Sequence, residues 1–235
     1  MNSSEPFAAI LGLLALTLKR RAPDHAEGSA ASVAQRSLAT LGLTPNGLQA
    51  LLIVAGVSCC IAMSMPQVHI VAYCADLGYG VARGAEMLSL MLGFGIVSRV
   101  ATGWLADRVG GAMTLLLGST LQAVALVFYL VADSLISLYL ASALFGLFQG
   151  GIVPSYAIIV REYFPAREAA SRVGLTVSST IVGMALGGWM GGVLFDITGS
   201  YRAAFINGIA WNVLNAGVAW WLLSRQNRRL PPVAA

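Results

Sequence analysis

The sequence predicts an all-α membrane protein, built as a bundle of six transmembrane helices. Of its 235 residues, 57% are hydrophobic and only 10% are charged, and the mean hydropathy is +0.77. Soluble globular proteins carry about 25% charged residues, and no helix-length segment of this chain has a charged face that could meet water. The hydrophobic residues also fall into six runs, each long enough to cross about 30 Å of hydrocarbon as a helix.

These six runs define the expected elements. They lack the alternation of apolar and polar residues that is typical of membrane strands, and their short connections favour antiparallel neighbours. A proline in the first run (Pro66) and one in the fourth (Pro154) each remove a backbone hydrogen bond and can kink their helices. The expected spans are residues 49–73, 84–105, 112–132, 135–160, 173–195 and 203–223.

The N-terminal stretch PFAAILGLLALTLKRR has an apolar part too short to span a membrane. A signal peptide carries its basic residues before the apolar run, whereas Lys19, Arg20 and Arg21 follow it here. We therefore expect residues 1–21 to be the end of a helix that starts further upstream. The expected organisation is this partial helix, a polar linker at 22–46, a six-helix domain at 47–225 and a tail at 226–235.

The basic residues predict the orientation of the chain in the membrane. With the linker placed inside, eleven basic residues lie inside, two (Arg83 and Arg202) lie outside, and Arg99 lies within a span. An excess of Lys and Arg marks the cytoplasmic side, so we expect the linker and the C-terminus in the cytoplasm. The eleven are Lys19, Arg20, Arg21, Arg36, Arg108, Arg161, Arg167, Arg172, Arg225, Arg228 and Arg229.

Several classes of function are excluded by composition. The basic residues sit at the ends of apolar runs and form no stripe along a helix face, which argues against a nucleic-acid partner. Three cysteines without C-x-x-C spacing and only two histidines predict no metal site and no cofactor. A membrane enzyme would be expected to carry a cluster of His, Asp or Glu near one face, and the sequence has no such cluster.

The loop GWLADRVGG, residues 103–111, joins the second and third spans. Gly103 lets a neighbouring helix approach closely, and Gly110 can take a positive φ where the chain reverses. Asp107, followed by Arg108, can dock on the positive N-terminal end of an adjacent helix, a contact worth about 0.3–1 kcal/mol. Such a contact can form in one conformation and break in another, as a gate requires.

The spacing Gly103-x-x-x-Asp107-Arg108-x-Gly110 resembles the signature loop of the major facilitator superfamily. Residues 161–175 resemble the basic loop between the fourth and fifth helices of a half in that family, and residues 183–201 resemble its glycine-rich eleventh helix and the turn that follows. Gly111 and Ala112 replace the basic pair that normally ends the signature. The resemblance covers residues 47–225 and implies helices seven to twelve of a twelve-helix fold. It implies secondary transport by alternating access, with a six-helix N-terminal half as the partner.

The most unusual residue of the second span is Arg99, because an arginine at a span centre costs about 2.5–3.5 kcal/mol. Its long side chain can snorkel to the membrane face, or its planar guanidinium can face a central cavity and hold a carboxylate. The spacing R-x-x-x-G resembles the monocarboxylate transporter branch, whose arginine at this place binds the substrate. That resemblance implies a small monocarboxylate-like anion as substrate. Gln149 and Tyr156 are further candidates to line the cavity, and as polar residues within spans they can instead form hydrogen bonds between helices.

Glycines recur every four residues along the fifth span, at Gly183, Gly187 and Gly191, with Gly188 and Gly192 beside them. Small residues let helix backbones pack closely in lipid, where hydrophobic burial supplies little driving force. We therefore expect these five glycines to serve helix packing.

One half of a transporter cannot form a complete site, so three arrangements stay open at this point. The chain works with a separate N-terminal half, it works as a homodimer, or it is a truncated fragment inactive in transport. In all three arrangements the chain lies in a lipid bilayer, and the resemblance to bacterial transporters implies the inner membrane.

Overall fold

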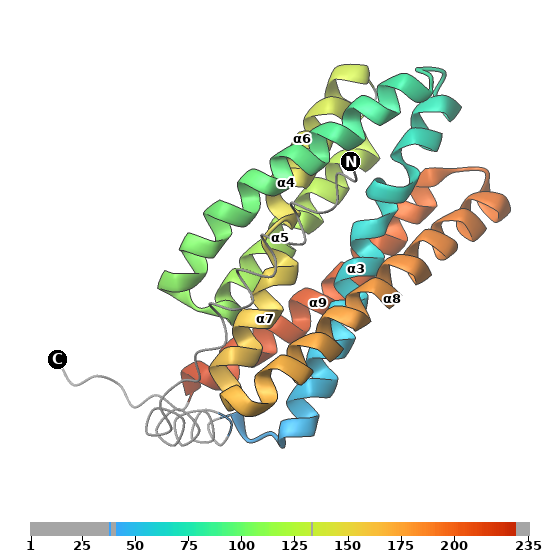
Figure 1. The fold of residues 1–235 in the computed structure, drawn as a ribbon. Coiled ribbons are helices and arrows are strands. Elements are labelled where there is room, and N and C mark those ends of the chain that lie inside the picture. The colour runs from blue at the N-terminus through green and yellow to red at the C-terminus, as the bar shows by residue number, and fades with distance from the viewer. Residues whose placement is uncertain (1–37, 39–40, 133, 229–235) are drawn as a thin grey trace, which may run out of the picture.

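The computed structural model describes residues 38, 41–132 and 134–228, and in that part of the chain all regular structure is helical. Figure 1 shows the helices lying side by side as one elongated bundle, with the short connections gathered at its two ends. In chain order they are α3 (Pro45–Asp76), α4 (Val81–Val109), α5 (Gly111–Val131), α6 (Leu135–Gln149), α7 (Ile152–Tyr163), α8 (Ala166–Thr198) and α9 (Tyr201–Arg228).

Five segments are long and apolar enough to cross a membrane: α3, α4, α5, α8, and α6 together with α7. The sixth expected span, α9, has the length but is not among them, because Asn207, Asn212 and Asn215 make it more polar. It still packs along α3 and α5, and its Phe205 and Ala219 are fully buried. The expected all-α membrane bundle is therefore confirmed, with α9 as a more polar sixth long helix.

The expected partial helix at 1–21 lies outside the described residues, as do most of the linker and residues 229–235. The first helix of the bundle begins at Pro45, where the Thr44 hydroxyl accepts a hydrogen bond from the Gly47 amide at 3.1 Å. Proline suits this first helical position because its missing N–H would have no helical partner there. At the other end of the chain, α9 continues to Arg228.

The centre of the bundle is α3, which contacts α8, α9 and α4 along its length. It continues through Pro66 without interruption. Its contact with α8 advances in the same direction on both helices, so the two run parallel. At the start of the contact, Gln49 Nε2 donates a hydrogen bond to Thr176 Oγ1 at 2.9 Å. At its far end, His69 Nε2 lies 3.1 Å from the Gly188 carbonyl oxygen.

Between those points the glycines of α8 bring the two backbones together. A Cβ atom at Gly183 would lie 2.5 Å from the Val57 carbonyl oxygen, and one at Gly187 would lie 2.7 Å from that of Ile61. A Cβ at Gly191 would meet the His69 ring. Gly188 has only ordinary contact with Val68, at 3.5 Å, and nothing lies within 4 Å of a Cβ at Gly192. The stripe therefore divides into three glycines in close contact with α3 and two that are not.

The fourth expected span is interrupted. Helix α6 ends at Gln149 and α7 begins at Ile152, so Gly150 and Gly151 separate two shorter helices. Pro154 explains the position of the break, because it has no N–H to donate to the carbonyl of Gly150 four residues earlier. Both glycines face α4: a Cβ at Gly150 would lie 2.5 Å from the Gly95 carbonyl oxygen, and one at Gly151 would meet the Thr102 side chain.

Candidate functional site

Helix α4 has one buried face and one exposed apolar face. Its buried face packs on α3 and α6, where a Cβ at Gly84 would lie 2.5 Å from Val71 Cα. On the other face Ile96, Val100 and Trp104 are 65%, 74% and 59% exposed. Exposed apolar surface of this extent indicates contact with lipid or with another protein.

Arg99 lies on α4 at the level of the interrupted span. The preceding residue, Ser98, is buried, and a Cβ at Gly150 would lie 2.7 Å from the Cβ atom of Ser98. The Arg99 side chain itself is exposed, and its guanidinium has no hydrogen bond, ion pair or stacked ring with any residue that the structure describes. The arginine is thus available to a group from outside this bundle.

Gln149 is the last residue of α6, directly before the break. It is only 5% exposed, and its Oε1 has no hydrogen-bond partner among the described residues. A buried amide oxygen without a partner costs about 1–3 kcal/mol. The structure therefore brings Arg99 and Gln149 to two elements in direct contact, α4 and the break between α6 and α7.

Tyr156 is placed differently from what we expected. It is fully buried, and its hydroxyl donates a hydrogen bond to Asn215 Oδ1 at 2.7 Å. Asn215 Nδ2 in turn donates to Ser119 Oγ, and Asn212 Nδ2 donates to the Ser119 carbonyl oxygen, both at 2.7 Å. The tyrosine ties α7 to α9 and α5. Since this side chain has no surface to offer a solute, we leave Tyr156 out of the binding surface.

The expected loop is mostly helical, because α4 continues to Val109 and only Gly110 separates it from α5; Gly103, Asp107 and Arg108 are exposed on the last turns of α4. Nothing lies within 4 Å of a Cβ at Gly103, and the Asp107 side chain has no hydrogen bond or ion pair with a described residue. The Arg108 guanidinium lies over the Trp104 ring, 3.8 Å from its centroid. Gly110 has a φ of +81° and ends α4, as the expected chain reversal requires.

A residue that sequence reasoning passed over, Glu162 at the end of α7, docks on the start of α5. Its Oε1 accepts a hydrogen bond from the Gly111 amide at 2.8 Å. The N-cap residue of α5 is Gly110, which has no side chain to accept this hydrogen bond. The absence of a capping side chain was the available signal: the first amides of α5 need an acceptor from elsewhere. A carboxylate suits the positive end of a helix.

We expect Glu162→Ala to lower the free energy of unfolding by about 1–2 kcal/mol, since it removes the only side-chain acceptor described at this helix start. Thermal unfolding in detergent measures the effect. Glu168→Ala is the matched control: Glu168 is also an acid near a helix start, but it is half exposed and pairs with Arg172. The control should change stability by less than about 1 kcal/mol. Equal effects of the two substitutions would contradict the capping role.

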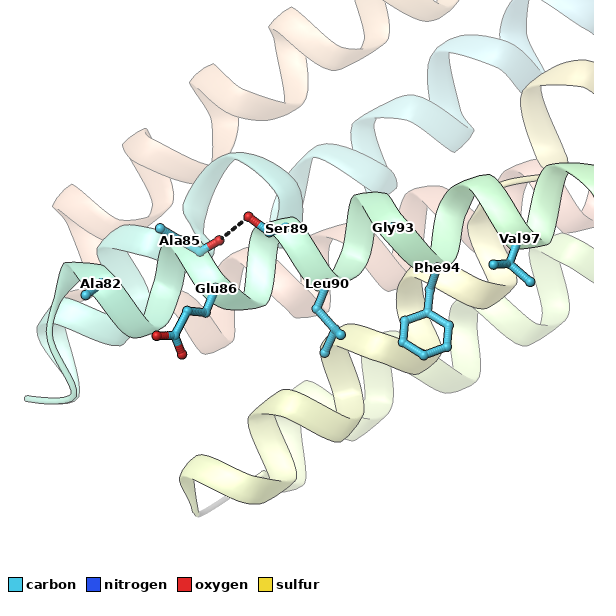
Figure 2. A pocket seen from close by; sticks show the side chains of 8 residues that line it. All are labelled: Ala82, Ala85, Glu86, Ser89, Leu90, Gly93, Phe94 and Val97. Atoms are coloured by element: carbon cyan, nitrogen blue, oxygen red, sulfur yellow. Dashed lines mark hydrogen bonds between the residues drawn. The ribbon is translucent and has the colours of Figure 1, made fainter.

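A groove with a volume of about 800 Å³ runs along the exposed face of α4 (Figure 2). Figure 2 shows the Glu86, Leu90 and Phe94 side chains along the same side of the helix. The Glu86 carboxylate accepts a hydrogen bond from Arg83 Nη1 at 3.0 Å and one from the Tyr139 hydroxyl. The small residues Ala85, Ser89 and Gly93 also line it, and such residues admit a closely packed helix.

Comparison with known proteins now decides the family. The model of the Major Facilitator Superfamily matches residues 87–235, more than half of the chain. This chain belongs to the Major Facilitator Superfamily. The family expected from the loop at Gly103–Gly110 is thereby confirmed, and the chain is an integral membrane protein.

Relatives of this facilitator chain are transporters by name. It is 33% identical over 156 residues to the rat monocarboxylate transporter 13, and this aligned segment covers 66% of the chain and 36% of that protein. It is 28% identical over 137 residues to probable anion transporter 5 of Arabidopsis thaliana, covering 57% of the chain and 32% of that protein. It is 32% identical over 111 residues to an Escherichia coli D-galactonate transporter, covering 47% and 24%.

The chain spans about a third of the length of the first relatives it matches. Among the residues that the structure describes, no group of three or more His, Cys, Asp or Glu side chains could hold a metal ion.

Proposed function

We propose that this chain forms one half of a transporter that moves a small organic anion, similar to a monocarboxylate, by alternating access. The exposed, unpartnered guanidinium of Arg99 beside the interrupted span is the observation that carries this proposal. In support, the three relatives described above are named for monocarboxylates, anions and D-galactonate.

The charge of Arg99 explains why an anion is the favoured solute. Arg99 is the only lysine or arginine inside the expected spans, and a charge in a span is costly unless a partner compensates it. A planar guanidinium binds a carboxylate through two parallel hydrogen bonds. One cation matches one carboxylate, which favours a monoanion over a dianion. Gln149 stays a candidate in the neighbouring element, where its buried Oε1 has no hydrogen-bond partner among the described residues.

The missing part of the site comes from a second six-helix half in this proposal. Transporters of this kind rock two halves about a site at their interface near the bilayer midplane. The exposed face of α4, its groove and the exposed Gly103 and Asp107 form a surface that such a half would cover. In this arrangement the Asp107 carboxylate docks on the N-terminal end of a helix of that second half. A homodimer supplies the second half in the alternative arrangement, and a fragment inactive in transport is the remaining one.

The orientation follows from the arginines at one end of the bundle, which we call the basic end. Arg108, Arg161, Arg167 and Arg225 lie there, whereas Arg83 and Arg202 lie at the opposite end. We place the basic end, the linker and the C-terminus in the cytoplasm, and the protein in a bacterial inner membrane.

Uptake into proteoliposomes tests the proposal. The purified chain is reconstituted alone and together with a six-helix N-terminal half supplied as a separate polypeptide, and labelled lactate and D-galactonate are the probes. We expect saturable uptake that other monocarboxylates inhibit and that the uncharged amides of the same acids do not. Uptake by the chain alone would support the homodimer. Equal inhibition by the amides, or no uptake in either preparation despite verified insertion, would contradict the proposal.

A further inference from the structure

A second pocket lies at the end of the bundle opposite the basic end. It has a volume of about 260 Å³ and is bounded by the ends of α3 and α5 and the starts of α6 and α9. None of its lining residues belongs to α4, to the break between α6 and α7, or to the loop that follows α4. It is therefore separate from the proposed transport site.

Two opposite charges line this pocket without pairing with each other. Asp76 and Arg202 are both exposed, and no ion pair within the described residues joins them. The Arg202 guanidinium is held in place, because its Nη2 donates a hydrogen bond to the Leu130 carbonyl oxygen at 2.7 Å. A guanidinium carries five N–H groups, so most of its donors remain for an anionic group.

The position of Asp76 is not explained by helix stability. It is the last residue of α3, and no basic residue lies in that last turn. The C-terminal end of a helix carries partial negative charge, so a carboxylate there is unfavourable. A cation in the pocket would compensate both the helix end and the carboxylate.

Aromatic rings make up much of the remaining lining. Tyr73 and Tyr201 are buried at its base, with ring centroids 5.6 Å apart in an edge-to-face arrangement, and Tyr79 is half-buried beside them. The pocket thus offers a carboxylate to a cation and a guanidinium to an anion, and its volume suits a small zwitterionic group.

Exposed apolar side chains lead away from this pocket along the helices that bound it. On α5, Val127, Phe128 and Val131 are 46%, 43% and 62% exposed, and on α9 Ile206 is 57% exposed. Acyl chains can lie along such faces, which favours a lipid over a soluble zwitterion as the occupant.

We propose that this pocket binds the headgroup of a phospholipid bearing a primary amine, with the phosphate at Arg202 and the ammonium at Asp76. The acyl chains then lie along α5 and α9. This binding does not depend on which solute the protein transports.

Native mass spectrometry of the purified chain in detergent tests the proposal. The probes are phosphatidylethanolamine, phosphatidylcholine with the same acyl chains, and soluble phosphoethanolamine. We expect phosphatidylethanolamine to bind about tenfold or more tightly than phosphatidylcholine, because the quaternary choline group has no N–H to donate to a carboxylate. The soluble headgroup should compete weakly. Equal binding of the two lipids, or competition by phosphoethanolamine as strong as by the lipid, would overturn the assignment.

Substitutions in the pocket separate the two charges. Asp76→Asn should lower phosphatidylethanolamine affinity to the level of phosphatidylcholine and leave the latter unchanged, with no loss of thermal stability. Arg202→Gln should weaken both lipids about tenfold. Arg83→Gln is the control, since Arg83 lies at the same end but outside the pocket and pairs with Glu86 at 3.0 Å. An unchanged lipid preference in the folded Asp76→Asn variant would also overturn the proposal.

Discussion

A Gly187→Ala substitution should lower the free energy of unfolding by about 1–3 kcal/mol, because a single added methyl group has no room between α8 and α3. The new Cβ would lie 2.7 Å from the Ile61 carbonyl oxygen and 2.8 Å from Ile61 Cα, and it would also overlap the Ser64 hydroxyl. Two of these obstacles are backbone atoms, so the helices themselves must separate. The loss should extend along the whole contact between the two parallel helices, and thermal unfolding in detergent measures it.

Gly192→Ala is the matched control on the same helix. Nothing lies within 4 Å of its Cβ position, and alanine favours a helix over glycine by about 0.5–1 kcal/mol. This variant should be as stable as the wild type or slightly more stable. Wild-type stability of the Gly187→Ala variant would show that α3 and α8 do not pack as closely as described.

An Arg99→Ala substitution should reduce kcat/KM for anion uptake by the assembled transporter about 30-fold or more. Removing one partner of a desolvated charge pair costs about 2–5 kcal/mol. Because the side chain has no partner among the described residues of the bundle, the variant should insert and fold as the wild type does. Uptake of labelled lactate, normalised to the amount of protein in the proteoliposomes, is the measurement.

Arg99→Lys makes this test specific. Lysine keeps the positive charge but loses the planar fork that binds a carboxylate at two points, so uptake should fall to a level between wild type and Arg99→Ala. If both variants transport at the wild-type rate, the arginine only snorkels to the basic end, and the anion site lies elsewhere.

Several features of the site could be predicted from residue type and spacing. The chain reversal at the positive-φ residue Gly110 and the position of Arg99 on an apolar helix follow from the local sequence, whereas residues 103–109, expected in a loop, belong to α4. The roles of Glu162 and Tyr156 could not be predicted this way. Each is decided by a partner more than fifty residues away, Gly111 for the glutamate and Asn215 for the tyrosine. An isolated polar residue near a span end or within a span carries no local signal for such a partner.

The amino-acid sequence alone determined that this protein is a helical membrane bundle, because the length and polarity of each apolar run depend only on neighbouring residues. It also determined where the chain reverses. Only the tertiary structure decided which glycines matter: Gly183, Gly187 and Gly191 meet the α3 backbone, whereas Gly192, in the same stripe, meets nothing within 4 Å. A helix repeats every 3.6 residues, so small residues on adjacent flanks look equivalent in sequence. The angle at which a second helix crosses determines which flank it covers.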